Sequence, residues 1–194
     1  MFLHKLIVAL TGASGVIYGV TLARELLARD YEVHLVASDP ARIVIEQELK
    51  WIPEPNWEDV FRQKLPGQMV YYENCNIAAP IASGSFITDG MIIIPCTMST
   101  VAAVANGLSN NLIERAADVM IKERRPLIIV PRETPLSVVH LTNMLKLAQI
   151  GVQVVPAMPG YYHDPQSVTD MVNFVVGKVM DSLGVAHNLY KRYD

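Results

Sequence analysis

The chain has 194 residues, 51% of them hydrophobic, and a formal net charge of −3 at pH 7. Its length fits one ordinary domain, its negative charge argues against nucleic acid as the main partner, and its mean hydropathy of +0.26 indicates apolar surface buried between subunits. Cys75 and Cys96 are the only cysteines, which excludes a disulfide framework and fits a reducing, cytoplasmic compartment.

The first expected unit is a strand, a glycine turn and a helix. Residues 6–10 (LIVAL) are apolar without alternation, as in a strand buried on both faces of a parallel sheet. Gly12 and Gly15 allow a tight turn, and Ser14 is placed to cap the helix that follows. Such a helix N-terminus attracts anions, and the turn GASG suits a single phosphate better than a dinucleotide. We therefore expect a mononucleotide phosphate at this turn.

The remaining chain alternates strands with helices. The expected strands are residues 31–37, 69–72, 91–94, 127–130 and 152–155. The expected helices are residues 41–50, 101–107, 111–123, 136–150 and 167–183, with a Pro-rich surface connection of one or two helical turns at 51–67. Residues 90–113 carry no charge, but the Pro and Asn residues among them favour a buried core over a membrane span. The pattern predicts a single α/β domain over residues 1–194, with a doubly wound, mainly parallel sheet in three layers.

Polar loops follow the expected strands, at the edge where doubly wound sheets bind ligands. They carry hydroxyl groups at Ser14, Ser38, Thr97, Ser99 and Thr100. N-capping accounts for any one of these hydroxyls, whereas several of them together fit the neutral donors that hold a phosphate and a ribityl chain. This edge is where we expect the chemistry.

Five basic residues crowd into one short segment. Four of them, Arg115, Lys122, Arg124 and Arg125, lie among acidic residues, and a solvated helix face is the default interpretation. Arg132 differs because it lies between two prolines in a loop after a strand, where we expect it to contact an anion. The five histidines show no ligand spacing, so no metal site is predicted.

Several strings of the sequence together resemble the UbiX-type flavin prenyltransferases, formerly labelled 3-octaprenyl-4-hydroxybenzoate carboxy-lyases or phenolic acid decarboxylase subunits. They are TGASGVIYG, ASGSF, PCTMST, NNLIERAADVMIKERRPLIIVPRETPL, HLTNMLKLAQIG and PGYYHDPQS, and they span nearly the whole chain. The resemblance implies a flavodoxin-like fold and a homo-oligomer, a dodecamer, with FMN bound near subunit contacts. It also implies transfer of a dimethylallyl group from dimethylallyl phosphate to N5 and C6 of reduced FMN, without a metal. The product, prenylated FMN, would serve UbiD-type decarboxylases.

The resemblance also assigns site residues. Those implied to bind FMN are Gly12, Ala13, Ser14, Ser38, Thr97, Met98, Ser99, Thr100 and Arg132. Those implied to bind dimethylallyl phosphate, some of them from a neighbouring subunit, are Arg115, Lys122, Arg132, Tyr162 and Lys178. Ser14, Glu48 and Glu133 are implied to handle protons near flavin N5.

The tail departs from the family pattern, and two other functions stay open from the sequence alone. Many relatives have a Trp near the C-terminus, and Tyr193 is the counterpart here, which leaves the role of the tail open. One alternative function is an FMN-dependent cysteine decarboxylase, whose PASANT-like motif is absent because residues 156–160 read PAMPG. The other is a non-catalytic flavin-binding decarboxylase subunit, against which the retained charged and aromatic residues argue.

Overall fold

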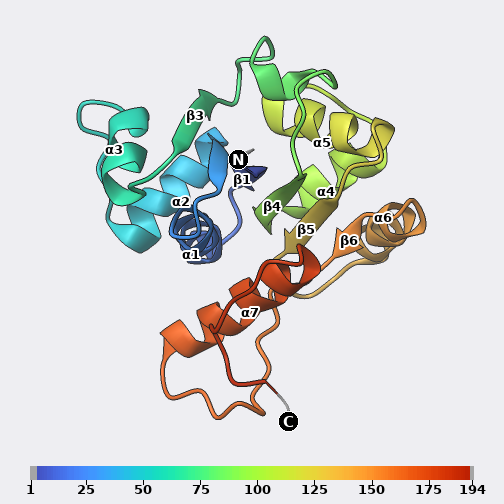
Figure 1. The fold of residues 1–194 in the computed structure, drawn as a ribbon. Helices are drawn as coiled ribbons and strands as arrows, with labels where there is room; N and C mark the ends of the chain where they lie inside the picture. The colour runs from blue at the N-terminus through green and yellow to red at the C-terminus, as the bar shows by residue number, and fades with distance from the viewer. Residues whose placement is uncertain (1–3, 193–194) are drawn as a thin grey trace.

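The computed structural model describes residues 4–192, and its centre is a six-stranded sheet in which every pairing is parallel. The strands are β1 (Lys5–Leu10), β2 (Glu32–Ala37), β3 (Met69–Glu73), β4 (Gly90–Cys96), β5 (Leu127–Pro131) and β6 (Gln153–Val154). They lie in the order β3-β2-β1-β4-β5-β6 (Figure 1). The chain therefore winds outward from β1 in one direction and from β4 in the other, and the direction reverses between these two strands.

Helices cover both faces of this sheet, which gives three layers (Figure 1). One face carries α1 (Val16–Leu27), α2 (Asp39–Leu49), α3 (Trp57–Lys64) and α7 (Val168–Ser182). The other face carries α4 (Met98–Ala105), α5 (Leu112–Lys122), α6 (Val138–Gln149) and a short 3-10 turn, η1 (Pro80–Ala82). No helix among residues 4–192 combines the length and the apolarity that crossing a membrane needs.

The two faces divide the core between alternate residues of each strand. In β1, Leu6, Val8 and Leu10 belong to the core beneath α1 and α7, while Ile7 and Ala9 belong to the core beneath α4 and α5. All five side chains are buried, which explains why the sequence shows no alternation of apolar and polar residues there. Because helices cover both faces of the sheet, a ligand site is expected at the ends of the strands.

Two glycines fit α1 to the sheet. A Cβ on Gly19 would lie 2.2 Å from the carbonyl oxygen of Ile94 in β4, so no side chain fits between helix and strand. Gly15 has a φ of 96°, a left-handed conformation that favours glycine, at the end of the turn from which α1 starts. The turn after β1 is thereby held close to the end of β4.

The expected fold class and element order are confirmed, with differences at element ends. α4 begins at Met98, earlier than the expected helix at 101–107, because the Thr97 side chain caps it. The connection at 51–67 contains α3, which matches the one or two expected turns. β6, an edge strand that pairs with β5 alone, is only two residues long, shorter than the expected strand at 152–155. Residues 90–113 form β4, α4 and the start of α5 within the core, as expected.

Candidate active site

The loops after β1 and β4 meet where the winding direction reverses. The Thr11 hydroxyl donates to the carbonyl oxygen of Pro95 at 2.7 Å and accepts from the backbone N–H of Thr97 at 2.8 Å. Thr11 is 3% exposed, so this bridge is shielded from water. Open parallel sheets bind ligands at such a reversal point, beyond the carboxyl ends of the strands. The candidate site is therefore the edge that these two loops form with their neighbours.

Hydroxyl groups gather at the start of α4. The Thr97 Oγ1 lies 3.0 Å from Ser99 Oγ and 2.9 Å from Thr100 Oγ1, and it accepts from the Thr100 N–H at 3.2 Å. Ser38 caps α2 in the same way, accepting from the N–H of Ala41 at 3.2 Å. N-capping is thus confirmed for Thr97 and Ser38. The α4 hydroxyls also lie at the positive end of a helix dipole, where a phosphate is favoured.

The turn at residues 12–15 differs from the expectation. Ser14 does not cap α1, because the N-cap residue is Gly15 and no side chain of the turn accepts from the helix. The Glu48 carboxylate takes this role, accepting from the N–H of Gly15 at 2.9 and 3.1 Å and from that of Val16 at 3.2 Å. The two amides that we expected to bind a phosphate therefore bind a carboxylate of the chain itself, because α2 ends beside the turn.

Arg132 reaches the same turn from the loop after β5. Its Nε donates to the carbonyl oxygen of Ser14 at 3.3 Å, and its backbone N–H donates to that of Cys96 at 3.4 Å. Burial raises the pKa of the nearby Tyr18 phenol, an effect that the charge of Arg132 opposes and the charge of Glu48 reinforces. The structure thus brings Ser14, Glu48 and Arg132 together around one turn, with Tyr18 as a neighbour that the sequence analysis missed.

Two adjoining cavities continue this edge beyond β5 and β6. The first has a volume of about 460 Å³ and is lined by residues that include Arg132, Glu133, Leu136 and Met158. The second has a volume of about 370 Å³ and is lined by residues that include Val155, Met158, Phe174 and Lys178. Met158 belongs to both cavities. Arg132 and Lys178 therefore border two neighbouring cavities that share the apolar side chain of Met158.

Tyr162 lies beside the second cavity through its contact with Phe174. The two rings meet edge to face, with their centroids 5.5 Å apart. The Lys178 Nζ lies 5.6 Å from the centroid of the same Phe174 ring. Tyr162 and Lys178 are thus brought to one neighbourhood, as the resemblance implied. Tyr193, whose role the sequence left open, lies outside the described residues.

The structure does not bring Lys122 to Arg132 within one chain. α5 leads directly into β5, so Lys122, its last residue, lies at the amino ends of the strands, whereas Arg132 follows the carboxyl end of β5. Lys122 pairs with Glu123, and Arg115 pairs with Asp118 on its own helix at 2.8 Å. Within the chain, both cations therefore belong to the charged helix surface of the default interpretation.

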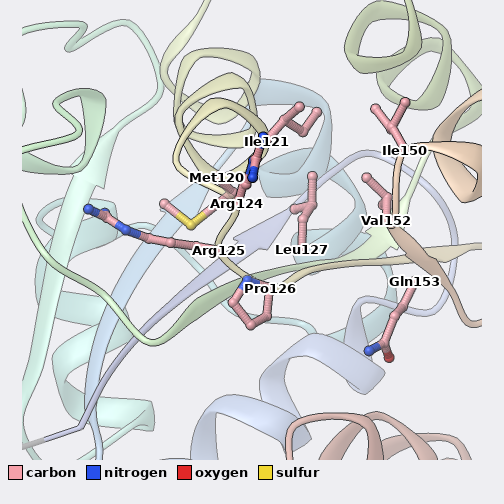
Figure 2. A pocket seen from close by; sticks show the side chains of 10 residues that line it. Met120, Ile121, Arg124, Arg125, Pro126, Leu127, Ile150, Val152 and Gln153 are labelled. Carbon is pink, nitrogen blue, oxygen red and sulfur yellow. The ribbon is translucent and has the colours of Figure 1, made fainter.

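A larger cavity, about 470 Å³, lies at the opposite edge beside the amino end of β5 (Figure 2). Its apolar wall includes Met120, Ile121, Leu127, Ile150 and Val152. Arg125 also borders it, but its guanidinium donates to the carbonyl oxygens of Phe86 at 2.8 Å and Gly84 at 2.6 Å. None of the expected site residues that the structure describes lines this cavity, so it is not part of the candidate site.

Comparison with known proteins finds relatives over nearly the whole chain. The model of the Flavoprotein family matches residues 3–180. The flavin prenyltransferase UbiX of Alkalihalophilus pseudofirmus is 51% identical over 189 residues, which cover 96% of this chain and 94% of the relative. A crystal structure of AnUbiX (PadA1) in complex with FMN and dimethylallyl pyrophosphate has a TM-score of 0.91 at 36% identity, covering 100% of this chain and 98% of the other. A dodecameric FMN-dependent UbiX-like decarboxylase from Escherichia coli O157:H7 has a TM-score of 0.89 at 43% identity, covering 98% of this chain and 99% of the other.

These similarities extend over nearly the whole chain and confirm the resemblance that the sequence strings carry. They select a flavin prenyltransferase enzyme over the cysteine decarboxylase and the non-catalytic subunit that the sequence left open. The chain belongs to the Flavoprotein family and, within it, to the UbiX flavin prenyltransferases.

Proposed function

We propose that the chain transfers the dimethylallyl group of dimethylallyl phosphate to N5 and C6 of reduced FMN, and so makes prenylated FMN for UbiD-type decarboxylases. The main observation behind this proposal is that Glu48 and Arg132 both bind the turn after β1, and that Arg132 also lines a cavity. A proton acceptor and a fixed cation at one edge are what the displacement of an allylic phosphate needs. The AnUbiX complex with FMN and dimethylallyl pyrophosphate supports the choice of ligands.

The residues at the reversal point fit FMN. The α4 hydroxyls offer donors to a phosphate at a helix N-terminus, and Ser38 joins the same edge because its N–H donates to the Leu10 carbonyl oxygen at 3.0 Å. We assign FMN binding to Gly12, Ala13, Ser14, Ser38, Thr97, Met98, Ser99, Thr100 and Arg132. Bound reduced FMN supplies the nucleophile, so the chain itself needs no nucleophilic Ser, Cys or His.

Arg132, Lys178 and Tyr162 are the proposed contacts of the donor's phosphate within the chain. The phosphate leaves as a dianion, so the cations must be in place before the C–O bond breaks. Each charge-assisted hydrogen bond contributes about 1.5–3 kcal/mol. Met158, between the two cavities, offers an apolar contact for the dimethylallyl group. Two cations and a phenol thus give the leaving group a binding site built from side chains alone.

Glu48 is the proposed acceptor of the proton that leaves N5, directly or through the Ser14 hydroxyl. Its Oε1 accepts a single backbone N–H bond and keeps a second lone pair for a proton, whereas its Oε2 accepts from both Gly15 and Val16. The backbone bonds also fix the direction of the carboxylate, because Gly15 and Val16 belong to the start of a helix. Glu133, which lines the first cavity, is the proposed second carboxylate.

Assembly into a homo-oligomer is part of the proposal. The Escherichia coli O157:H7 relative is dodecameric, and α6 of this chain exposes an apolar surface with Val138 at 79%, Val139 at 66% and Leu145 at 57% exposed. Apolar surface of this extent on one helix is typical of an interface. We propose that a neighbouring subunit completes the donor site with its own Arg115 and Lys122, which in their own chain do not reach Arg132. We place this assembly in the cytoplasm, because Cys75 and Cys96 are free thiols.

The test is anaerobic incubation of the purified protein with reduced FMN and dimethylallyl phosphate, followed by mass spectrometry of the flavin. We expect a flavin heavier by one dimethylallyl unit, without added metal. Arg132→Met removes the fixed cation and should abolish this product. The proposal fails if the wild-type protein binds both compounds and returns only unmodified FMN.

A further inference from the structure

The chain after α7 folds back onto that helix as a strap, residues 185–192. The strap begins where the Val185 N–H donates to the Met180 carbonyl oxygen at 2.9 Å. It lies so close to α7 that a Cβ on Gly177 would be 2.6 Å from the Tyr190 ring and 2.7 Å from the His187 ring. The strap is therefore packed against the helix that carries Lys178.

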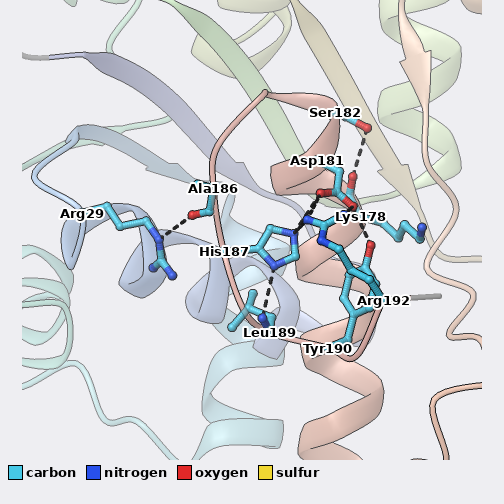
Figure 3. A network of polar contacts seen from close by, with 9 residues as sticks. All are labelled: Arg29, Lys178, Asp181, Ser182, Ala186, His187, Leu189, Tyr190 and Arg192. Atoms are coloured by element: carbon cyan, nitrogen blue, oxygen red, sulfur yellow. Dashed lines mark hydrogen bonds and ion pairs between the residues drawn. The ribbon is translucent and has the colours of Figure 1, made fainter. Parts of the chain in front are cut away.

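Asp181 fastens this strap (Figure 3). Its carboxylate accepts from the Tyr190 hydroxyl at 2.5 Å and from Arg192 Nη2 at 2.6 Å, and it lies 3.1 Å from His187 Nε2. Burial acts to raise the pKa of Asp181, but the hydrogen bonds from Arg192, Tyr190 and His187 outweigh it and lower the pKa to about 2. One charged carboxylate thus fixes three side chains of the strap.

Tyr190 in turn lies beside Lys178. The Lys178 Nζ is 5.2 Å from the centroid of the Tyr190 ring and 5.6 Å from that of the Phe174 ring. Aromatic faces attract an ammonium group without neutralising it. The Tyr190 phenol also raises the pKa of Lys178 against the opposing effect of burial, so the ammonium stays charged. Lys178 borders the second cavity, whose wall includes Phe174.

We propose that Tyr190, fixed by Asp181, is a positioning residue that holds the Lys178 ammonium at the rim of the second cavity, ready for the phosphate of the donor. This inference rests on the proposed function, because it needs Lys178 to bind that phosphate. Without the strap, four rotatable bonds would leave the lysine free to move, and binding the donor would have to order it. The proposal thus gives the tail of the chain a role through the aromatic ring of Tyr190, and not through Tyr193.

The experiment measures dimethylallyl phosphate binding to the FMN-loaded protein by calorimetry, together with KM, kcat and Tm. Tyr190→Leu removes the ring beside Lys178 and should raise the donor Kd and KM about fivefold, while the Kd for FMN stays unchanged. Tyr190→Phe keeps the ring but loses the Asp181 bond, so its donor Kd should lie between those of wild type and Tyr190→Leu. If Tyr190→Leu does not fold, Tyr190→Phe carries the test.

Two further variants separate positioning from general stability. Arg29 Nε donates to the Ala186 carbonyl oxygen near the start of the strap at 3.0 Å, so Arg29→Gln removes one strap contact and leaves the hydrogen bond between Tyr190 and Asp181 in place. It should lower Tm and leave the donor Kd unchanged. In a Lys178→Met background, Tyr190→Leu should add no further loss of donor affinity, because its effect acts through the lysine.

The donor Kd values test the positioning role of Tyr190 separately from the proposed function. An unchanged donor Kd in Tyr190→Leu, or an equal loss with and without Lys178, would overturn the positioning role while leaving the proposed function intact. A wild-type protein that binds no dimethylallyl phosphate would overturn the proposed function and this inference with it.

Discussion

The Glu48 carboxylate is hydrogen-bonded to the backbone N–H of Gly15 at 2.9 and 3.1 Å, which joins the end of α2 to the start of α1. A negative charge at this place is stabilised by the positive end of the α1 dipole. The same turn carries the Ser14 carbonyl group that accepts from Arg132. A carboxylate and a guanidinium are therefore held on one short turn by backbone groups, which fixes them more firmly than contacts between flexible side chains would.

Glu48→Gln tests the proton role of this carboxylate. The amide keeps the shape but is not a base, so we expect FMN and donor to bind while the prenylated product forms at least about a hundredfold more slowly. Single-turnover mass spectrometry of the flavin measures the rate. Glu46→Gln, an exposed change on the same helix, should behave like wild type. Product formed by Glu48→Gln at the wild-type rate would remove Glu48 from proton transfer and make Glu133 the next candidate.

Thr97→Val tests the hydroxyl cluster at α4. The substitution removes the cap on the Thr100 N–H and the central hydroxyl of the cluster, so we expect a loss of about 1 kcal/mol in stability and weaker FMN binding. Fluorescence titration of FMN and a denaturant melt measure the two effects. Asn56→Ala is the matched control, since it removes the cap of α3, whose residues line neither cavity of the candidate site. It should cost similar stability and leave FMN affinity unchanged; equal FMN affinity in both variants would count against a phosphate at α4.

Leu145→Asp tests assembly through α6. Leu145 is 57% exposed, so a charge there should leave the fold of the single chain intact but disrupt an apolar interface. We expect light scattering to show smaller particles and the prenylation rate to fall, because the Lys122 of a neighbouring subunit would no longer reach the site. Ile52→Asp places the same charge at a position that is 66% exposed in the connection before α3, and we expect it to assemble normally. A fully active monomer would contradict the shared site.

The pH dependence of the strap follows from Asp181. Its pKa falls from the usual 3.8 to about 2 on folding, so its bonds stabilise the fold at pH values above about 4 and lose their effect as the pH falls toward 2. Asp181→Asn should therefore lower Tm at neutral pH, and the difference from wild type should shrink between pH 4 and pH 2. Thermal melts over this range measure it. A difference that is constant with pH would mean that the carboxylate charge does not hold the strap.

The helices and strands were predictable because each follows from the pattern of apolar and polar residues within its own segment. The unbroken apolar run at residues 6–10 indicated a strand sealed on both faces, and β1 is such a strand. Capping by Ser38 and Thr97 could also be predicted, because each side chain accepts from the backbone N–H of the residue three positions later in the chain. Ser14 fits the same local rule, but in the structure the N–H groups at the start of α1 bond instead to Glu48, which is 33 residues after Gly15.

The composition of the site was less predictable, because it depends on how distant loops meet. The family resemblance implied roles for Glu48 and Arg132, but no spacing showed that both would contact the turn after β1. Thr11, in the strand-end loop 11–15, was not singled out as a site residue, although a β-branched hydroxyl directly after a buried strand was a usable signal. The Asp181 strap had no local signal at all, since its three partners become neighbours only when the chain doubles back along α7.

The contact of Gly19 with Ile94 has a consequence for protein engineering. With no space between α1 and β4, the position of α1 resists redesign, because any larger residue at Gly19 would force the helix off the sheet. The loop of residues 156–165 after β6, by contrast, contains no helix or strand, and its Met158, which lines both cavities, is 64% exposed. A variant meant to accept a longer prenyl chain should therefore be sought by substitution at Met158 and its neighbours, with α1 left as it is.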